Sequence, residues 1–227
     1  MLDNARALCY RRLVSNASIP KYIAVDGPIG AGKTTLARML AEQMGGHLCL
    51  EPAEKNPFLS EFYKDRSRNA FKTQLFFLLN RYQQQLELRQ RDLFAQTLVC
   101  DYTFAKDLIF AKVNLSEDEL ALYNTVFDLL RERLPNPDLV IYCRAEPRVL
   151  LSRVKKRGFD YERAINEEYL ENLTDSYNRH FLNYDETPLL VVDTSEQDYM
   201  ERPEDFENIK RAILSHRGGT VHLIARS

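Results

Sequence analysis

The chain has 227 residues, which is enough for one α/β domain with a sizeable buried core. Its 31 basic and 33 acidic residues nearly balance, so no strongly basic face points to a nucleic-acid partner. No apolar run approaches the roughly 18 residues of a membrane-spanning helix, so we expect no membrane partner either.

The first twenty residues are unusual in charge. Arg6, Arg11, Arg12 and Ser15 stand with a single acid, Asp3, which resembles a weak organelle transit peptide. A short amphipathic helix or a frayed tail before the first strand is the alternative, and it is the interpretation we favour. We therefore expect residues 1–20 to form an N-terminal extension outside the folded domain.

Five short apolar runs predict buried strands, and helical patterns separate them. The strands are expected at residues 22–26, 47–51, 97–101, 139–143 and 189–193. The helices are expected at 34–44, 58–65, 71–90, 104–111, 117–133, 147–156, 167–184 and 203–215. This alternation predicts a five-stranded parallel sheet with helices on both faces. The C-terminal segment, residues 218–227, is expected to be a tail or to hold an extra edge strand at residues 220–224.

Four cysteines stand at positions 9, 49, 100 and 143. Three of them fall inside predicted buried strands, and no Cys-x-x-Cys pair is present. This pattern indicates small core residues in a reducing compartment, so we expect a cytoplasmic protein.

A phosphate-binding motif follows the first strand. Residues 27–34 match G-x-x-x-x-G-K-[ST] at every specified position. Glycines allow backbone N–H groups to close around phosphate oxygens, and the start of the next helix adds positive potential. We expect Lys33 to reach the β- and γ-phosphates and the Thr34 hydroxyl to bind Mg²⁺. The loop as a whole comprises Gly27, Pro28, Ile29, Gly30, Ala31, Gly32, Lys33, Thr34 and Thr35.

Acidic residues end several of the predicted strands. In open α/β sheets the ligand lies at the carboxyl ends of the strands, so Asp26, Glu51 and Asp101 should lie near the phosphate loop. Glu51 is placed to accept a proton from an attacking hydroxyl, and Asp101 is placed to hold Mg²⁺ directly or through water. For both, a solvated acid at a strand end is the alternative.

Further polar residues are candidates only because of the phosphate loop. Arg153, Lys156 and Arg157 share one helical face, which is typical of a solvated surface but also of a cationic lid over a phosphoryl group. Gln74 and Arg81 lie seven residues apart on one face of the long helix. A glutamine amide can hydrogen-bond a nucleobase edge, and an arginine adds planar donors.

Other classes of nucleotide-binding protein fit less well. A small GTPase would carry an N-K-x-D guanine reader and a D-x-x-G switch, and the sequence has neither. Motor ATPases are normally longer or carry nucleic-acid-binding features.

Together these residues resemble the deoxyribonucleoside kinase family, which contains deoxycytidine, deoxyguanosine and deoxyadenosine kinases, and its bacterial branch most closely. The likeness runs from about Lys21 to Asp193. It rests on G-P-I-G-A-G-K-T-T at 27–35, L-E-P at 50–52, N-P-F-L-S-E-F-Y at 56–63, T-Q-L-F-F-L-L-N-R at 73–81, D-Y-T-F-A-K-D at 101–107, R-V-K-K-R-G at 153–158 and E-E-Y-L-E-N-L at 167–173.

The resemblance implies a role for each matching position. Glu51 matches the general base for the sugar 5′-hydroxyl, and Tyr63 with Glu168 matches the pair that hydrogen-bonds the 3′-hydroxyl. Gln74 matches the amide that reads the base. The remaining matches are Arg81 and Asp107 as a charged pair beside the base, Asp101 as the acid near Mg²⁺, and Arg153 and Arg157 as lid cations. The resemblance also implies a kinase domain over residues 21–217, ATP or another nucleoside triphosphate as donor, and a homodimer.

The sequence departs from the family pattern at two places. The usual Arg-Ser after the motif acid is Tyr102-Thr103 here, so one site cation is missing or comes from elsewhere. The lid usually continues R-G-R, but this chain has Arg157-Gly158-Phe159, and Arg163 is a candidate replacement. Both departures affect the phosphate clamp rather than the reaction class.

The sequence thus predicts an ATP-dependent kinase for the 5′-hydroxyl of a deoxynucleoside, acting in nucleotide salvage. The Gln74 amide and an Arg81–Asp107 pair favour purine deoxynucleosides, with deoxyadenosine first and thymidine poorest. A thymidylate-type monophosphate kinase and a non-catalytic nucleotide-binding protein are the alternatives.

Overall fold

The computed structural model describes residues 20–90, 97–195 and 198–223. The expected N-terminal extension lies outside these residues, apart from its last position. The C-terminal segment predicted at 218–227 is described up to residue 223.

Within the described residues, six parallel strands form one sheet, in the order β2-β3-β1-β4-β5-β6. Their bounds are β1 Tyr22–Asp26, β2 His47–Cys49, β3 Leu98–Cys100, β4 Leu139–Arg144, β5 Leu189–Asp193 and β6 Thr220–Leu223. β1 lies between β3 and β4, so the chain leaves β1 at the point where the strand order reverses. A crevice opens at the carboxyl ends of the strands at such a point, which places the phosphate loop there.

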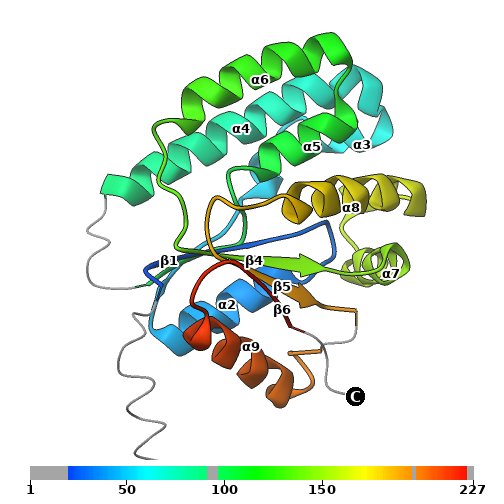
Figure 1. The fold of residues 1–227 in the computed structure, drawn as a ribbon. Helices are drawn as coiled ribbons and strands as arrows, with labels where there is room; N and C mark the ends of the chain where they lie inside the picture. Colours follow the sequence, from blue (N-terminus) through cyan, green and yellow to red (C-terminus); the bar gives the residue numbers. More distant parts are fainter. Residues whose placement is uncertain (1–19, 91–96, 196–197, 224–227) are drawn as a thin grey trace, which may run out of the picture.

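Helices cover both faces of the sheet (Figure 1). Two of them, α2 (Lys33–Met44) and α9 (Pro203–Ser215), lie on one face. The other face carries α8 (Glu167–Leu182) and, beyond it, α5 (Lys106–Asn114), α4 (Arg66–Gln90) and α6 (Glu117–Arg131). The remaining helices are α3 (Leu59–Lys64) and α7 (Pro147–Arg157). None of the described helices is long and apolar enough to cross a membrane.

The predicted strands are confirmed, and a sixth is added. β6 pairs in parallel with β5 from Thr220 opposite Leu189, so residues 220–223 form an edge strand, and residue 224 lies outside the described residues. β6 is mostly exposed. In the sequence, the apolar run after Gly218 and Gly219 is too short to distinguish an edge strand from a tail. The second strand ends at Cys49 rather than at Glu51, because the Glu51 N–H bonds the Asp101 side chain instead of a neighbouring strand.

Three cysteines lie on three strands of the sheet. Cys49, Cys100 and Cys143 are buried on β2, β3 and β4, as the apolar character of those strands predicted. They pack among aliphatic and aromatic core residues on the two faces of the sheet. Cys9 lies outside the described residues.

Candidate active site

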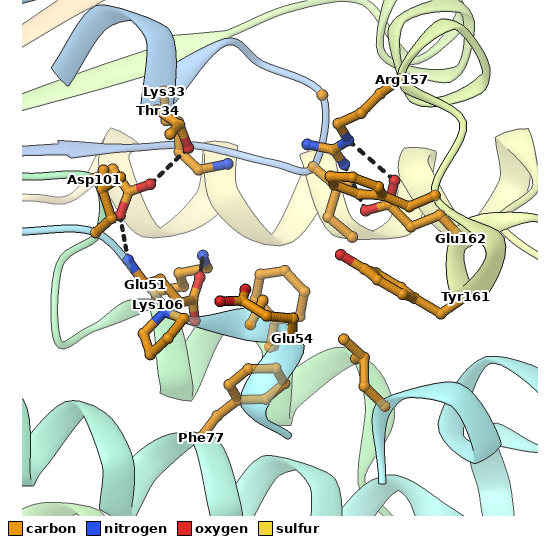
Figure 2. A pocket seen from close by; sticks show the side chains of 18 of the residues that line it. Lys33, Thr34, Glu51, Glu54, Phe77, Asp101, Lys106, Arg157, Tyr161 and Glu162 are labelled. Carbon is orange, nitrogen blue, oxygen red and sulfur yellow. Dashed lines mark hydrogen bonds and ion pairs between the residues drawn. The ribbon is translucent and has the colours of Figure 1, made fainter. Parts of the chain in front are cut away.

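A cavity of about 790 Å³ opens at the carboxyl ends of the strands. Its wall includes the phosphate loop, the segment after β2, α3, α4, the start of α5, and the segment that follows α7. Figure 2 shows side chains from these segments pointing toward the same space. Its volume suits a small-molecule ligand of nucleotide size, because ligand pockets in proteins usually span about 300–1,000 Å³.

The phosphate loop has the backbone that its glycines predict. Gly32 has φ of 85° and caps the N-terminus of α2, and a Cβ at this position would stand 2.2 Å from the Tyr199 hydroxyl. That hydroxyl donates to the Gly32 carbonyl at 2.9 Å. Lys33 donates from Nζ to the Pro28 carbonyl at 2.8 Å, across the mouth of the loop. Burial, helped by the charge of Lys106, lowers the pKa of Lys33 to about 8.

Asp101 connects the phosphate loop to Glu51. One of its oxygens, Oδ2, accepts from the Thr34 hydroxyl at 2.6 Å, and Oδ1 accepts from the Glu51 backbone N–H at 2.8 Å. The carboxylate therefore fixes the start of α2 and the segment after β2 relative to each other. It lies where the strand ends predicted an acid, and it lines the cavity with Thr34 and Glu51.

Thr34 and Asp101 suit a magnesium ion. Mg²⁺ prefers oxygen ligands and usually keeps several waters beside one or two protein carboxylates and the phosphates of the substrate. The structure offers a hydroxyl and a carboxylate side by side at the start of the phosphate-binding helix. Among the described residues no group of three His, Cys, Asp or Glu side chains could hold a metal ion.

Glu51 is held by two cations. Its Oε1 pairs with Arg81 of α4, and its Oε2 pairs with Lys106 of α5. Burial acts to raise the pKa of Glu51, but the charges of Arg81 and Lys106 outweigh burial and lower the pKa to about 2. Lys106 is a site residue that the sequence reasoning missed, although it lies within the D-Y-T-F-A-K-D segment at 101–107.

Arg81 and Asp107 form the buried ion pair that the resemblance implied. Burial raises the pKa of Asp107 to about 7, against the opposing charge of Arg81. The pair is not fully satisfied, since Asp107 Oδ2 and Arg81 Nε have no hydrogen-bond partner within the described part of the chain. Arg81 lines the cavity, and so does Gln74, which is buried two helical turns earlier on α4.

The segment after α7 closes the opposite side of the cavity. Arg157, the last residue of α7, forms a two-point ion pair with Glu162, at 2.5 Å from Nη2 to Oε1 and 3.1 Å from Nε to Oε2. Figure 2 shows this pair across the cavity from Glu51. Tyr161 stacks between Phe159 and Tyr63, and all three rings line the cavity.

The acid beside Tyr63 is Glu162 rather than Glu168. Glu168 lies in the first turn of α8 and is exposed, because Tyr169 and Leu170 occupy the buried face of that helix. It does not line the cavity, whereas Glu162 is buried and does. One feature of the sequence points to Glu162: it stands five residues after Arg157, close enough to fold back onto it through a short turn.

Only one of the predicted lid arginines lines the cavity. Arg153 donates to the Thr194 carbonyl at 2.6 Å and to its hydroxyl at 3.1 Å, so it ties α7 to the end of β5. The candidate replacement Arg163 is exposed and pairs with Asp160 at 2.6 Å. Neither residue lines the cavity, in contrast to Arg157. Arg153 lies one turn before Arg157 on α7. At the level of Arg153 the helix contacts the end of β5, whereas Arg157 lines the cavity.

Comparison with known proteins gives a consistent result. A family model described as deoxynucleoside kinase matches residues 23–216. The chain is 37% identical over 193 residues to the deoxyguanosine kinase of Bacillus subtilis (strain 168), covering 83% of this chain and 93% of that protein. It is 29% identical over 207 residues to the deoxyadenosine/deoxycytidine kinase of the same organism, covering 87% and 94%.

Solved structures give the same relationship. The structure of deoxyadenosine kinase from M. mycoides with bound dCTP matches with a TM-score of 0.74 and 32% identity, over 86% of this chain and 99% of that chain. A second structure of that kinase, with bound dATP, matches with a TM-score of 0.74 and 31% identity, over 86% and 100%.

Proposed function

The chain belongs to the deoxynucleoside kinase family, and from this membership we propose that its cavity transfers the γ-phosphoryl group of ATP to the 5′-hydroxyl of a deoxynucleoside. The enzyme is a phosphotransferase that acts on deoxynucleosides. One observation carries the proposal: Asp101 bonds both the Thr34 hydroxyl and the Glu51 backbone within a single cavity. A phosphate site and an acid suited to a hydroxyl acceptor are thereby fixed next to each other.

Each group at the centre of the cavity then has a chemical task. Glu51 accepts the proton of the 5′-hydroxyl while its oxygen attacks the γ-phosphorus, and the bond to the departing ADP breaks. Lys33 and the loop amides stabilise charge on the phosphate oxygens. Thr34 and Asp101 would hold Mg²⁺, which would neutralise phosphate charge. Arg157, on the opposite side, supplies the lid cation.

Tyr63 and Glu162 suit the sugar. The Tyr63 hydroxyl and the Glu162 carboxylate provide one donor and one charged acceptor at the cavity wall, which matches the needs of a 3′-hydroxyl. The Tyr63 ring packs edge-on against Phe62 and stacks on Tyr161, so its position is constrained. A fixed ring near C2′ disfavours the 2′-hydroxyl of a ribonucleoside, and deoxyribonucleosides are therefore the preferred substrates.

Base preference follows from Gln74 and the Arg81–Asp107 pair. The Gln74 amide offers one donor and one acceptor, which suits the N7 and 6-amino groups of adenine. The buried ion pair forms a planar wall beside the base. The 5-methyl group of thymine would pack against these charged groups and gain no favourable interaction from them. Purine deoxynucleosides are favoured, with deoxyadenosine first, deoxyguanosine next, deoxycytidine usable and thymidine poorest.

A homodimer in the cytoplasm fits the surface and the thiols. Leu79 on α4 and Leu122 and Leu129 on α6 are large apolar side chains exposed on neighbouring helices, and a second copy would cover them. The long helix α4 thus contributes Leu78 to the core and Leu79 to the proposed dimer interface. The three buried cysteines are small core residues, which agrees with a reducing compartment.

A thymidylate-type monophosphate kinase is the less favoured alternative. A monophosphate acceptor needs a cation of its own, and Arg81, the cation on the same helix as Gln74, already pairs with both Glu51 and Asp107.

An ATP-consumption panel over the four deoxynucleosides and their four monophosphates tests the proposal. We expect turnover with deoxynucleosides and none above background with monophosphates. Turnover with a monophosphate alone would replace the proposal with the alternative, and turnover with neither group would contradict both.

A further inference from the structure

Lys106 is a buried lysine at the first position of α5. It is 7% exposed, and its Nζ pairs with Glu51 Oε2 at the wall of the cavity. Lysines are almost never this buried without a charged partner or a task, because the ammonium group loses its hydration. Its position therefore calls for an explanation beyond helix formation.

The need to neutralise the charge of Glu51 does not explain why Lys106 is buried beside it. Arg81 already pairs with the Glu51 Oε1 atom, and a planar guanidinium is the better permanent partner for a buried carboxylate. A second cation adds a desolvation cost and lies near enough to Lys33 to repel its charge. A fold that only needed to neutralise Glu51 would be more stable with an apolar residue at position 106.

The neighbouring position 102 supplies no cation to the cavity. Tyr102 follows Asp101 directly and is fully buried, with its hydroxyl donating to Gln84 Oε1 at 2.6 Å. The Thr103 hydroxyl is likewise turned inward, onto Asp26. Lys106 comes four residues after Tyr102 and reaches the cavity from the start of α5, so it is the cation that this segment contributes.

Lys106 flanks the place where the phosphoryl group must move. The attacking 5′-oxygen has to lie within hydrogen-bond reach of Glu51, and the γ-phosphate has to lie against Lys33 and Thr34. Because Asp101 fixes Glu51 beside Thr34, the path between the two substrates is short. Figure 2 shows Lys106 at the Glu51 end of this path and Lys33 at the other.

We propose that Lys106 is a second catalytic lysine, which contacts an oxygen of the phosphoryl group as it passes from ATP to the 5′-oxygen. Without substrates its ammonium group rests on Glu51. When the γ-phosphate arrives, the flexible lysine stem lets the ammonium group turn to the phosphate oxygen, and Glu51 keeps Arg81 as its permanent partner. This inference rests on the proposed function.

The chemical step is balanced without further groups. The 5′-oxygen forms a bond to the γ-phosphorus, the bond from that phosphorus to the bridging oxygen of ADP breaks, and the hydroxyl proton goes to Glu51. Lys106 stays protonated throughout and contributes only charge and hydrogen bonds.

The test compares Lys106→Met and Lys106→Gln with Lys112→Met, a matched control in which an exposed lysine of the same helix is removed. In both Lys106 variants we expect kcat to fall by about 10²-fold, within the usual range for loss of one donor to developing charge. The KM for the deoxynucleoside and the dissociation constant for ATP should stay within about threefold, since the contact forms in the transition state. The control should match wild type.

The readouts separate catalysis from folding and from the proposed function. Circular dichroism and the melting temperature must match wild type in the variants that are assayed. A kcat within threefold of wild type in either folded Lys106 variant overturns the inference. A loss of kcat/KM that comes entirely from a higher KM overturns it as well. If wild type phosphorylates no deoxynucleoside, the proposed function fails first, and that result is visible before any variant is made.

Wild-type protein provides a measurement that does not depend on those variants folding. The ¹⁵Nζ signal of Lys106, assigned by its loss in Lys106→Arg, should shift when ADP–aluminium fluoride and a deoxynucleoside bind together, because the fluoride complex mimics the moving phosphoryl group. It should shift much less with the deoxynucleoside alone. An equal signal in the two states would overturn the inference.

Discussion

The two ends of the cavity are built in different ways. At the proposed donor end, the expected phosphate-binding groups come from one stretch, Gly27 to Thr35, six residues of which line the cavity, and backbone amides would do much of the binding. At the acceptor end, the side chains come from α3, α4, α5 and the segment after α7, far apart in sequence. A backbone site changes little when side chains are replaced, so substrate choice is adjusted at the acceptor end.

The largest loss of kcat is expected at the donor end, where the Lys33 side chain adds to the backbone amides. Lys33→Met removes the charge that follows the migrating phosphoryl group, and we expect kcat to fall by about 10³-fold. Steady-state kinetics measure the loss, and circular dichroism checks that the fold is intact. Activity within tenfold of wild type would mean that the backbone amides suffice.

Glu51 lies at the junction of the two ends. Glu51→Gln keeps the shape but removes the base, and kcat should fall by about 10²-fold or more, within the usual range for a general base. ATP affinity, measured by calorimetry, should stay within about threefold because the phosphate loop is untouched. A variant with kcat within threefold of wild type would remove Glu51 from the mechanism.

Glu162 and Glu168 form a matched pair at the acceptor end. Glu162→Gln should lower kcat/KM for deoxyadenosine by about 20-fold, the loss expected for one charged hydrogen bond to the 3′-hydroxyl. Glu168→Gln removes an exposed acid of the same type and should stay within about twofold. The reverse order would restore the assignment that the sequence resemblance gave.

Base choice is the smallest expected change, because it redistributes activity between substrates. Arg81→Met with Asp107→Ala opens the wall beside the base, and kcat/KM for thymidine relative to deoxyadenosine should rise by about tenfold. The overall rate should fall, since Arg81 also holds Glu51. The measurement is kcat/KM for all four deoxynucleosides with the wild type and the variant. Efficient phosphorylation of thymidine by the wild type would contradict the proposed role of the Arg81–Asp107 pair.

The contrast between the two ends also explains what the sequence could predict. The phosphate loop is a local motif, and Asp101 and Glu51 follow from the rule that strand ends meet at one edge of a sheet. Lys106, Glu162 and the true position of Arg153 depend on where a helix or a turn directs one side chain. A shift of one helical turn separates Arg153 from Arg157, and only packing against β5 decides which of them lines the cavity. The sixth strand was ambiguous because its apolar pattern is short and its side chains are mostly exposed.

The three buried cysteines give this sheet its own reporters of local opening. Cys49, Cys100 and Cys143 lie on β2, β3 and β4, and burial raises the pKa of Cys143 to about 12 and that of Cys100 well above its ordinary range. Such thiols stay unreactive until their strand is exposed to solvent. In a Cys9→Ser background, the rate at which a small alkylating reagent labels each cysteine therefore measures how often each strand opens, across both sides of β1, without any engineered probe.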